Sequence, residues 1–310
     1  MPEFIRVLTI LTALIPIFTL ILMGFILHRR TLLASEFWMP CERLNYFYLF
    51  PALMFSQIVT ADLAGISLRL VTIALLGGIV LGGSIVFLLQ ALFPRPGPVF
   101  SSVLQGALRP NTYVAVAAAT ALYGQPGLMV TAVAIAITIP VLNVGSIFIL
   151  MIHGDNGPVG KRHMVKTIVT NPVILSVVLG GVVNLAGIPM PDFVTAILKI
   201  LGSASLPLGL LSVGAGIDFA AVRASRGMIW LSSAIKLAVL PVATYGIGTS
   251  LGLTGTSLAT IILFNSLPCT PSTYIMARLF GGDYRIAASI ISIQTAIAAV
   301  TIPLVLAALV

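Results

Sequence analysis

The sequence predicts an all-α polytopic membrane protein with ten transmembrane helices, arranged as two inverted five-helix repeats. Three observations predict this fold. Of the 310 residues, 59% are hydrophobic and 8% are charged, whereas a soluble domain carries roughly 25% charged residues. Apolar stretches of about 20 residues, the length that crosses a bilayer, recur along the whole chain. Prolines also recur at matching places in the two halves of the chain.

Turn residues divide the apolar sequence into ten predicted spans. The first span is too long for the core of a signal peptide, so we expect it to be retained. The longest polar connection, residues 153–166, is a predicted cytoplasmic linker between a first repeat, residues 1–152, and a second repeat, residues 167–310. In order, the predicted spans are 4–28, 37–59, 68–93, 98–122, 126–152, 167–187, 191–216, 227–251, 256–281 and 285–309.

Basic residues predict the orientation in the membrane. The net charge of +8 suggests nucleic acid in a soluble protein, but here it is better explained by the rule that cytoplasmic loops are positively charged. Ten of the sixteen Lys and Arg residues fall at alternate connections. We therefore expect those connections in the cytoplasm and both termini outside a plasma (inner) membrane. The ten are Arg29, Arg30, Arg95, Lys161, Arg162, Lys166, Arg223, Arg226, Arg278 and Arg285; Arg6 and Arg69 fall on the other side, and Arg43, Arg109, Lys199 and Lys236 lie within spans.

Four proline pairs relate the two halves of the chain. They keep the same order, at separations of 156, 156, 161 and 163 residues. Because each half has an odd number of spans, the second copy must cross the membrane in the opposite sense. Inverted repeats of this kind are the architecture of many secondary transporters. The pairs are Pro16 with Pro172, Pro51 with Pro207, Pro110 with Pro271, and Pro140 with Pro303.

Spans 4 and 9 are each expected to break near their centres. Pro110 begins the sequence Pro-Asn-Thr-Tyr and Pro271 begins Pro-Ser-Thr-Tyr, with a further proline at Pro268. Proline removes a backbone donor and clashes with the preceding turn, which kinks or breaks a helix. In hydrocarbon, the freed backbone groups are tolerated only where they are buried in protein or line a wet cavity. Paired breaks at matching places predict a transporter's substrate site.

The residues at the breaks favour an anionic substrate. Helix N-termini carry unpaired N–H groups and a partial positive charge, which suit a carboxylate. Arg109 directly precedes the first break, and a membrane-embedded guanidinium is costly unless it is paired. We interpret it as the counter-ion of the substrate, because its fork holds a carboxylate with two hydrogen bonds. The alternatives are that Arg109 extends to the membrane interface or satisfies the break structurally.

Other polar residues near the breaks are secondary candidates for substrate contact. Asn111 either contacts the substrate or caps the helix that follows. Lys199 and Lys236 either titrate or pair during transport, or reach the membrane interface through their long stems, and we favour the interface. Tyrosines at helical spacing are often packing residues rather than ligands. The remaining predicted binding residues are Thr112, Tyr113, Asn265, Thr270, Ser272, Thr273 and Tyr274.

Four segments carry a resemblance to a known family. Through these segments, the chain resembles the auxin efflux carrier (PIN-like) family over essentially its whole length. Within that family, it resembles the bacterial members related to malate and malonate permeases. The resemblance implies that spans 4 and 9 cross at their breaks and that an Asn at position 111 contacts substrate. It also implies a scaffold from spans 1, 2, 6 and 7, a transport unit from spans 3–5 and 8–10 that moves as an elevator, and homodimers formed through the scaffold. The segments are Leu44-Asn45-Tyr46-Phe47 through Pro51-Ala52-Leu53-Met54-Phe55, Asn171-Pro172-Val173-Ile174-Leu175-Ser176, Leu206-Pro207-Leu208-Gly209-Leu210 with Gly214-Ala215-Gly216, and Leu267-Pro268 through Phe280-Gly281-Gly282-Asp283.

The predicted function is secondary active or potential-driven transport of small organic anions, mono- or dicarboxylates. Spans 4, 5, 9 and 10 contain no acidic residue, and Asp283 lies at the cytoplasmic end of span 9. Sodium sites need clustered oxygen ligands, and the distantly similar sodium–bile acid symporters carry a glutamate in the broken ninth helix. Sodium coupling is therefore disfavoured, and potential-driven movement or proton coupling remains.

Other function classes were weighed against transport. The sequence Gly248-Thr249-Ser250-Leu251-Gly252 matches a serine-hydrolase turn, but every histidine lies at the opposite, cytoplasmic side. We therefore expect no enzymatic activity and no catalytic residue, and also no metal, cofactor or nucleic-acid partner. Two alternatives stay open, a sodium-coupled symporter of the bile-acid-symporter type and a membrane channel or receptor.

Overall fold

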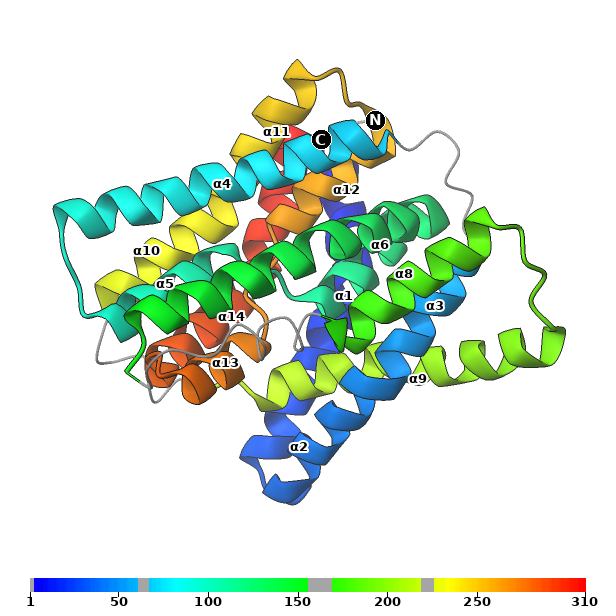
Figure 1. Cartoon of the computed structure of the whole chain (residues 1–310), viewed down its shortest axis with the longest axis horizontal. Helices are drawn as coiled ribbons and strands as arrows, with labels where there is room; N and C mark the ends of the chain where they lie inside the picture. The colour runs from blue at the N-terminus through cyan, green and yellow to red at the C-terminus, as the bar shows by residue number, and fades with distance from the viewer. Residues whose placement is uncertain (1–2, 61–66, 156–168, 219–225) are drawn as a thin grey trace.

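The computed structural model describes residues 3–60, 67–155, 169–218 and 226–310. These residues form helices and contain no β-strand (Figure 1). Six helical segments in them are long and apolar enough to cross a membrane, which agrees with the predicted all-α, multi-pass class. The predicted linker residues 156–166, and with them Lys161, Arg162 and Lys166, lie outside the described residues, as does Arg223.

Each of the ten predicted ranges falls on one helix or on a run of adjoining helices, whereas the ten-span inverted repeat stays a prediction. The first half contains α1 (Glu3–Arg29), α2 (Ser35–Leu44), η1 (Asn45–Leu49), α3 (Phe50–Val59), α4 (Leu68–Leu92), α5 (Gly97–Leu108) and α6 (Thr112–His153). The second half contains α8 (Pro172–Leu185), α9 (Asp192–Ala215), α10 (Arg226–Ala234), η3 (Ile235–Val239), α11 (Leu240–Ser250), α12 (Gly255–Asn265), α13 (Ser272–Phe280) and α14 (Tyr284–Leu309).

Local irregularities divide several of the helices. Gly124 has φ 61° and ψ −147°, a conformation open to glycine but strained for other residues, and it kinks α6 between predicted spans 4 and 5. The segments η1 and η3 are π-helical turns inside predicted spans 2 and 8. Sequence periodicity did not predict them, because a π turn adds a single residue to an otherwise regular helix.

The helices pack as two groups that meet along α1 and α6. In the first group, α1 packs against α9, and α3 packs against α8 and α9. In the second group, α4 packs against α11, α12 against α6, and α14 against α5, α10 and α13. Figure 1 shows α2, α3, α8 and α9 on one side of the molecule and α4, α10 and α11 on the other. The predicted scaffold and transport unit stay predictions.

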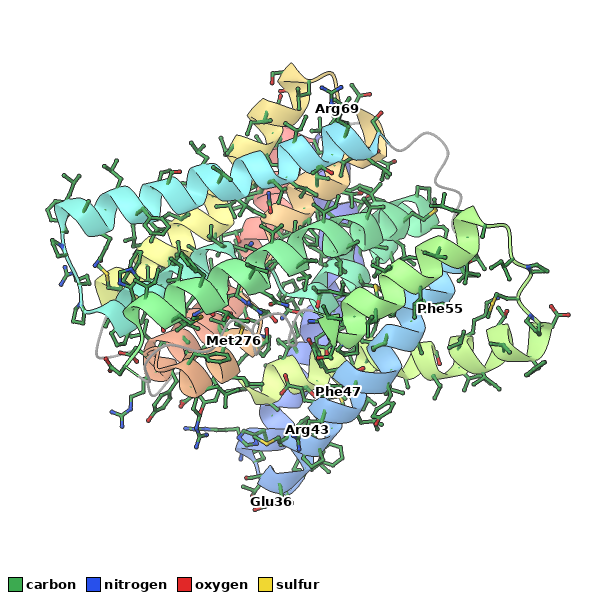
Figure 2. All side chains as sticks on the ribbon, in the orientation of Figure 1. Glu36, Arg43, Phe47, Phe55, Arg69 and Met276 are labelled. Carbon is green, nitrogen blue, oxygen red and sulfur yellow. The ribbon has the colours of Figure 1, made fainter. Side chains whose placement is uncertain are left out.

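The contacts between the two halves of the chain are reciprocal. The pairing of α1 with α9 joins spans 1 and 7, and the pairing of α3 with α8 joins spans 2 and 6. An inverted repeat requires this exchange, because a two-fold axis carries span 1 onto span 6 and span 2 onto span 7. In addition, Arg69 at the start of α4 lies across the molecule from Glu36 and Arg43 in α2 (Figure 2), as expected if the first two connections lie on opposite sides of a membrane.

Glycines bring α1 and α9 into close contact. A Cβ atom added to Gly24 would collide with the carbonyl oxygen of Leu211, and one added to Gly214 would collide with that of Ile21. Small residues at such contacts let helix backbones approach one another in a membrane, where packing rather than hydrophobic burial drives association. The same glycine-containing segment at residues 214–216 contributes to the family resemblance.

We predict that Gly214→Val lowers the free energy of unfolding by about 1–3 kcal/mol, the usual penalty for overpacking. The added side chain would meet the backbone of α1, which cannot move aside as a flexible side chain can. Thermal unfolding in detergent measures the effect. Gly216→Ala is the matched control, because a Cβ atom there has its nearest neighbour, the Val213 carbonyl oxygen, at 3.5 Å. Equal unfolding midpoints for the two variants would contradict the tight contact.

Candidate binding site at the two helix breaks

The break between α5 and α6 lies directly beside the break between α12 and α13. Pro110 and Cys269 face each other as an isolated antiparallel bridge. The backbone N–H of Asn111 donates a hydrogen bond of 2.8 Å to the carbonyl oxygen of Pro268. The structure therefore brings together the two proline-containing segments, which begin 161 residues apart at Pro110 and Pro271.

Gln294 in α14 connects both breaks. Its side-chain oxygen accepts a 2.8 Å hydrogen bond from the N–H of Cys269, and its side-chain nitrogen donates a 3.1 Å bond to the carbonyl oxygen of Gly106. The side chain is fully buried. Sequence reasoning missed this residue, although a lone glutamine in the middle of an apolar span was an available signal, because intramembrane polar groups are usually paired.

Arg109 is held inside the protein between two helices. Its side chain is 6% exposed, which excludes the alternative that it extends to the membrane interface. One terminal nitrogen donates to the hydroxyl of Ser146 in α6 at 3.1 Å, and the other donates to the hydroxyl of Ser272 in α13 at 3.0 Å. The third nitrogen, Nε, is buried and makes no hydrogen bond to the described residues. Its partners are neutral hydroxyls, so its charge is not balanced by them.

The described helices of the group that contains both breaks carry no acidic residue. Neither Asp nor Glu occurs in α4, α5, α6 or in α10 through α14. A buried guanidinium without an acidic partner is expensive, because water that would solvate the charge has been removed. The site can therefore lower its free energy by taking up an anion.

Asn111 caps α6 and keeps a free donor. Its side-chain oxygen accepts hydrogen bonds from the N–H groups of Tyr113 at 3.1 Å and Val114 at 3.3 Å, so the capping interpretation is confirmed in the geometry. The side-chain nitrogen is buried and has no hydrogen-bond partner among the described residues. Capping thus uses the acceptor of the amide and leaves its donor available for a ligand.

The second break offers hydroxyl groups. The hydroxyls of Thr270 and Ser272 lie 3.2 Å apart, and Ser272 also binds Arg109. The first turn of α13 has no side-chain cap, in contrast to α6. Thr273 is buried, and its hydroxyl lies 3.2 Å from the sulfur of Cys269. Ser272 and Thr270 are therefore placed with Arg109, whereas Thr273 is engaged within its own break.

The remaining predicted binding residues serve packing more directly. Asn265 donates to the hydroxyl of Thr244 at 2.6 Å, which ties α12 to α11. Tyr113 packs edge-to-face on Phe50 with ring centroids 4.9 Å apart. Tyr274 packs edge-to-face on Tyr284, with ring centroids 5.9 Å apart. These contacts agree with packing roles for both tyrosines.

Thr112 and the two lysines complete the set of sequence candidates. Thr112 is the first residue of α6 and is partly exposed. Lys199 in α9 is exposed, in agreement with the interface interpretation. For Lys236 that interpretation is wrong, because its side chain is fully buried and donates to the carbonyl oxygen of Leu108 at 3.2 Å. Its stem is directed inward by η3, which the sequence did not reveal.

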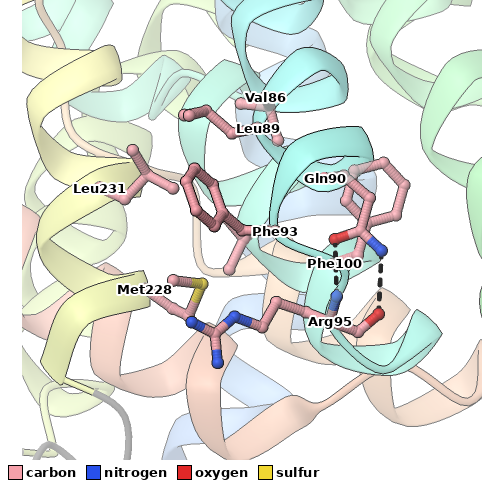
Figure 3. A pocket seen from close by; sticks show the side chains of 9 residues that line it. Val86, Leu89, Gln90, Phe93, Arg95, Phe100, Met228 and Leu231 are labelled. Carbon is pink, nitrogen blue, oxygen red and sulfur yellow. Dashed lines mark hydrogen bonds between the residues drawn. The ribbon is translucent and has the colours of Figure 1, made fainter.

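A small pocket lies away from the breaks, between α4, α5 and α10 (Figure 3). Its volume of about 180 Å³ is below the roughly 300–1,000 Å³ of typical ligand pockets. It includes none of the predicted binding residues, so it is not a second candidate for the substrate site. The pocket is lined by Val86, Leu89, Gln90, Phe93, Arg95, Phe100, Val103, Met228 and Leu231.

Comparisons with known proteins support a membrane transporter. Residues 158–306 match a family model described as "Membrane transport protein". The chain is 27% identical over 298 residues to an uncharacterized transporter of Methanothermobacter thermautotrophicus, with 96% of each chain covered. It is 22% identical over 172 residues to an uncharacterized transporter of Methanocaldococcus jannaschii, with 52% of this chain and 55% of the relative covered. The transport-family resemblance is supported, and the relation to malate and malonate permeases stays a prediction.

We predict that Gln294→Met lowers the free energy of unfolding by about 1–3 kcal/mol, because methionine keeps the volume but leaves the Cys269 N–H and the Gly106 carbonyl without their partner. The thermal midpoint in detergent should fall. Gln125→Met is the matched control, since Gln125 is exposed and bonds only another side chain, that of Gln57, in the described contacts. An unchanged midpoint for Gln294→Met would show that the breaks do not depend on this side chain.

Proposed function

We propose that this protein is a secondary carrier of small organic anions, mono- or dicarboxylates, which bind where the two helix breaks meet. One observation carries the proposal. Arg109 is buried, its Nε atom has no hydrogen-bond partner among the described residues, and the helices of its group contain no Asp or Glu. No described side chain of that group balances this cation, and a substrate carboxylate would supply the missing anion.

The donors around Arg109 support a carboxylate over a cation or a neutral solute. The unpartnered nitrogens of Arg109 and Asn111 can only donate hydrogen bonds, so they suit an acceptor. The N-terminus of α13, which has no side-chain cap, adds a partial positive charge, although the N–H groups of Thr273 and Tyr274 already donate to backbone carbonyl oxygens. We propose that the Arg109 and Asn111 donors bind the oxygens of a substrate carboxylate. A second carboxylate on the same substrate would bind the hydroxyls of Thr270 and Ser272, more weakly than the first carboxylate binds Arg109.

Elevator-type movement is part of the proposal. Both breaks, and every hydrogen bond of Arg109, belong to the group of helices around α4, α11, α12 and α14. A unit that contains its whole binding site can carry a bound solute across a fixed scaffold without dismantling that site. The scaffold would be α1, α3, α8 and α9, where the close glycine contacts of α1 and α9 support a rigid body.

The driving force is proposed to be the membrane potential, with proton coupling as the alternative. Moving one negative charge out of a cell that is negative inside releases about 2.3 kcal/mol per 100 mV. Export of an anion therefore needs no co-transported ion, whereas uptake needs one. Sodium coupling is the weaker proposal, since the helices that form the breaks provide no carboxylate ligand.

Counterflow in proteoliposomes tests the proposed function. We expect saturable uptake of labelled dicarboxylate, stimulated by unlabelled dicarboxylate inside the vesicles, because a carrier returns faster when loaded. An imposed potential should change the rate, and replacement of sodium by choline should not. Flux at channel rates without exchange would refute the carrier, and uptake that requires sodium would favour a sodium-coupled symporter.

We predict that Arg109→Ala weakens carboxylate binding about 10- to 100-fold, the range expected for loss of a charge-assisted hydrogen bond of about 1.5–3 kcal/mol. Arg109→Lys should lose less affinity, because it keeps the charge without the planar fork. Binding is measured by titration calorimetry or ligand-induced thermal shift in detergent. Arg278→Ala is the control, as Arg278 is exposed on α13. A carboxylate affinity of Arg109→Ala equal to that of wild type would refute the proposed role of Arg109 as the counter-ion of the substrate.

A further inference from the structure

Lys236 binds the backbone at the end of the first broken helix. Its side-chain nitrogen donates a 3.2 Å hydrogen bond to the carbonyl oxygen of Leu108, the last residue of α5. The side chain is fully buried. Because Leu108 immediately precedes Arg109, this contact fixes the backbone from which the proposed substrate counter-ion extends. The role proposed above for Arg109 makes no use of Lys236.

The ammonium has no acidic partner on the helices that surround it. η3 packs against α4, α5, α10, α11 and α14, none of which contains Asp or Glu. The only charged or titratable residues on these helices besides Arg226 are Arg69, Tyr245, Tyr284 and Arg285, and the nearby Cys269 lies on the second break. The group that Lys236 does contact is the C-terminal end of α5, and a helix C-terminus carries roughly half a negative charge on its free carbonyl groups.

The π-helical turn explains how a lysine reaches this position. Lys236 lies within η3, which interrupts the regular helix between α10 and α11. A π turn inserts a residue and redirects the side chains around it, and such turns occur frequently at functional sites. On the opposite side, Gly82 of α4 lies against Leu240 and Ile235, so that the widened turn fits between α4 and α5.

Carbonyl groups at unwound helix ends coordinate sodium in other secondary transporters. An ammonium group carries the same charge and satisfies the same oxygen. We propose that Lys236 is a built-in cation that takes the place of a coupling sodium ion at the end of α5, so that the carrier binds its anion without a metal ion. This inference rests on the proposed function. Lys236 is then a positioning residue: it affects anion binding by holding the backbone of Leu108, next to Arg109.

The test measures the affinity for succinate by thermal shift, in buffers that contain either choline or sodium as the cation. Wild type should bind equally well in both, within about twofold. Lys236→Met keeps the length and packing of the side chain without the charge, and should bind at least tenfold more weakly in choline. Lys199→Met, at an exposed lysine, is the matched control and should behave as wild type.

Chemical rescue distinguishes the contribution of the ammonium group of Lys236 from the contribution of its side-chain packing. Lys236→Ala removes three carbons and the nitrogen, which n-propylammonium supplies. We expect n-propylammonium to raise the thermal midpoint of Lys236→Ala in the absence of succinate, to leave that of Lys236→Met unchanged, and to restore succinate affinity in Lys236→Ala. Sodium should substitute in part for n-propylammonium in Lys236→Ala.

Three results would overturn the proposal. The first is a wild-type affinity that rises tenfold or more with sodium, a measurement that needs no variant to fold. The second is wild-type affinity in Lys236→Met, and the third is a Lys236→Ala midpoint that does not respond to n-propylammonium. If wild type binds no carboxylate at all, the proposed function fails, whereas the midpoint of Lys236→Ala still decides whether a cation is required at α5.

Discussion

The rest of the structure depends on one constraint, that backbone groups freed by proline inside a membrane must find partners within the protein. Here the two broken helices satisfy each other, through the bridge between Pro110 and Cys269 and the hydrogen bond from Asn111 to the carbonyl oxygen of Pro268. Gln294 binds both breaks from α14. The crossing is thus a structural requirement, and it fixes where polar side chains can converge.

Charge follows from the same arrangement. Two cations, Arg109 and Lys236, are buried at the first break, among helices that contain no acidic residue. They differ in what balances them. Lys236 binds the carbonyl end of α5, whereas Arg109 binds neutral hydroxyls and keeps an unpartnered nitrogen. In the proposed function, the substrate anion balances the charge of Arg109.

The sequence predicted the positions of the helices and of their breaks well, because both depend on local chemistry. Apolar length identifies a span, and proline marks a break wherever it lies. Gln294 and Lys236 could not be predicted in their roles, since each acts on a backbone group more than 100 residues away, at separations of 188 and 128 residues. A glutamine or lysine in an apolar span signals that a partner exists, but not which backbone group the partner is.

The sequence by itself determined that the chain is an all-helical, multi-pass membrane protein with two proline breaks, one of them beside an arginine. It did so because hydropathy, helix length and proline act within a few residues. The family resemblance added the expectation that the two breaks cross, which the structure bears out. Only the tertiary structure decided that Asn111 caps a helix with its amide oxygen while its amide nitrogen has no partner among the described residues, and that Lys236 points inward. These contacts depend on which helices become neighbours, and packing between segments far apart in the sequence decides which helices those are.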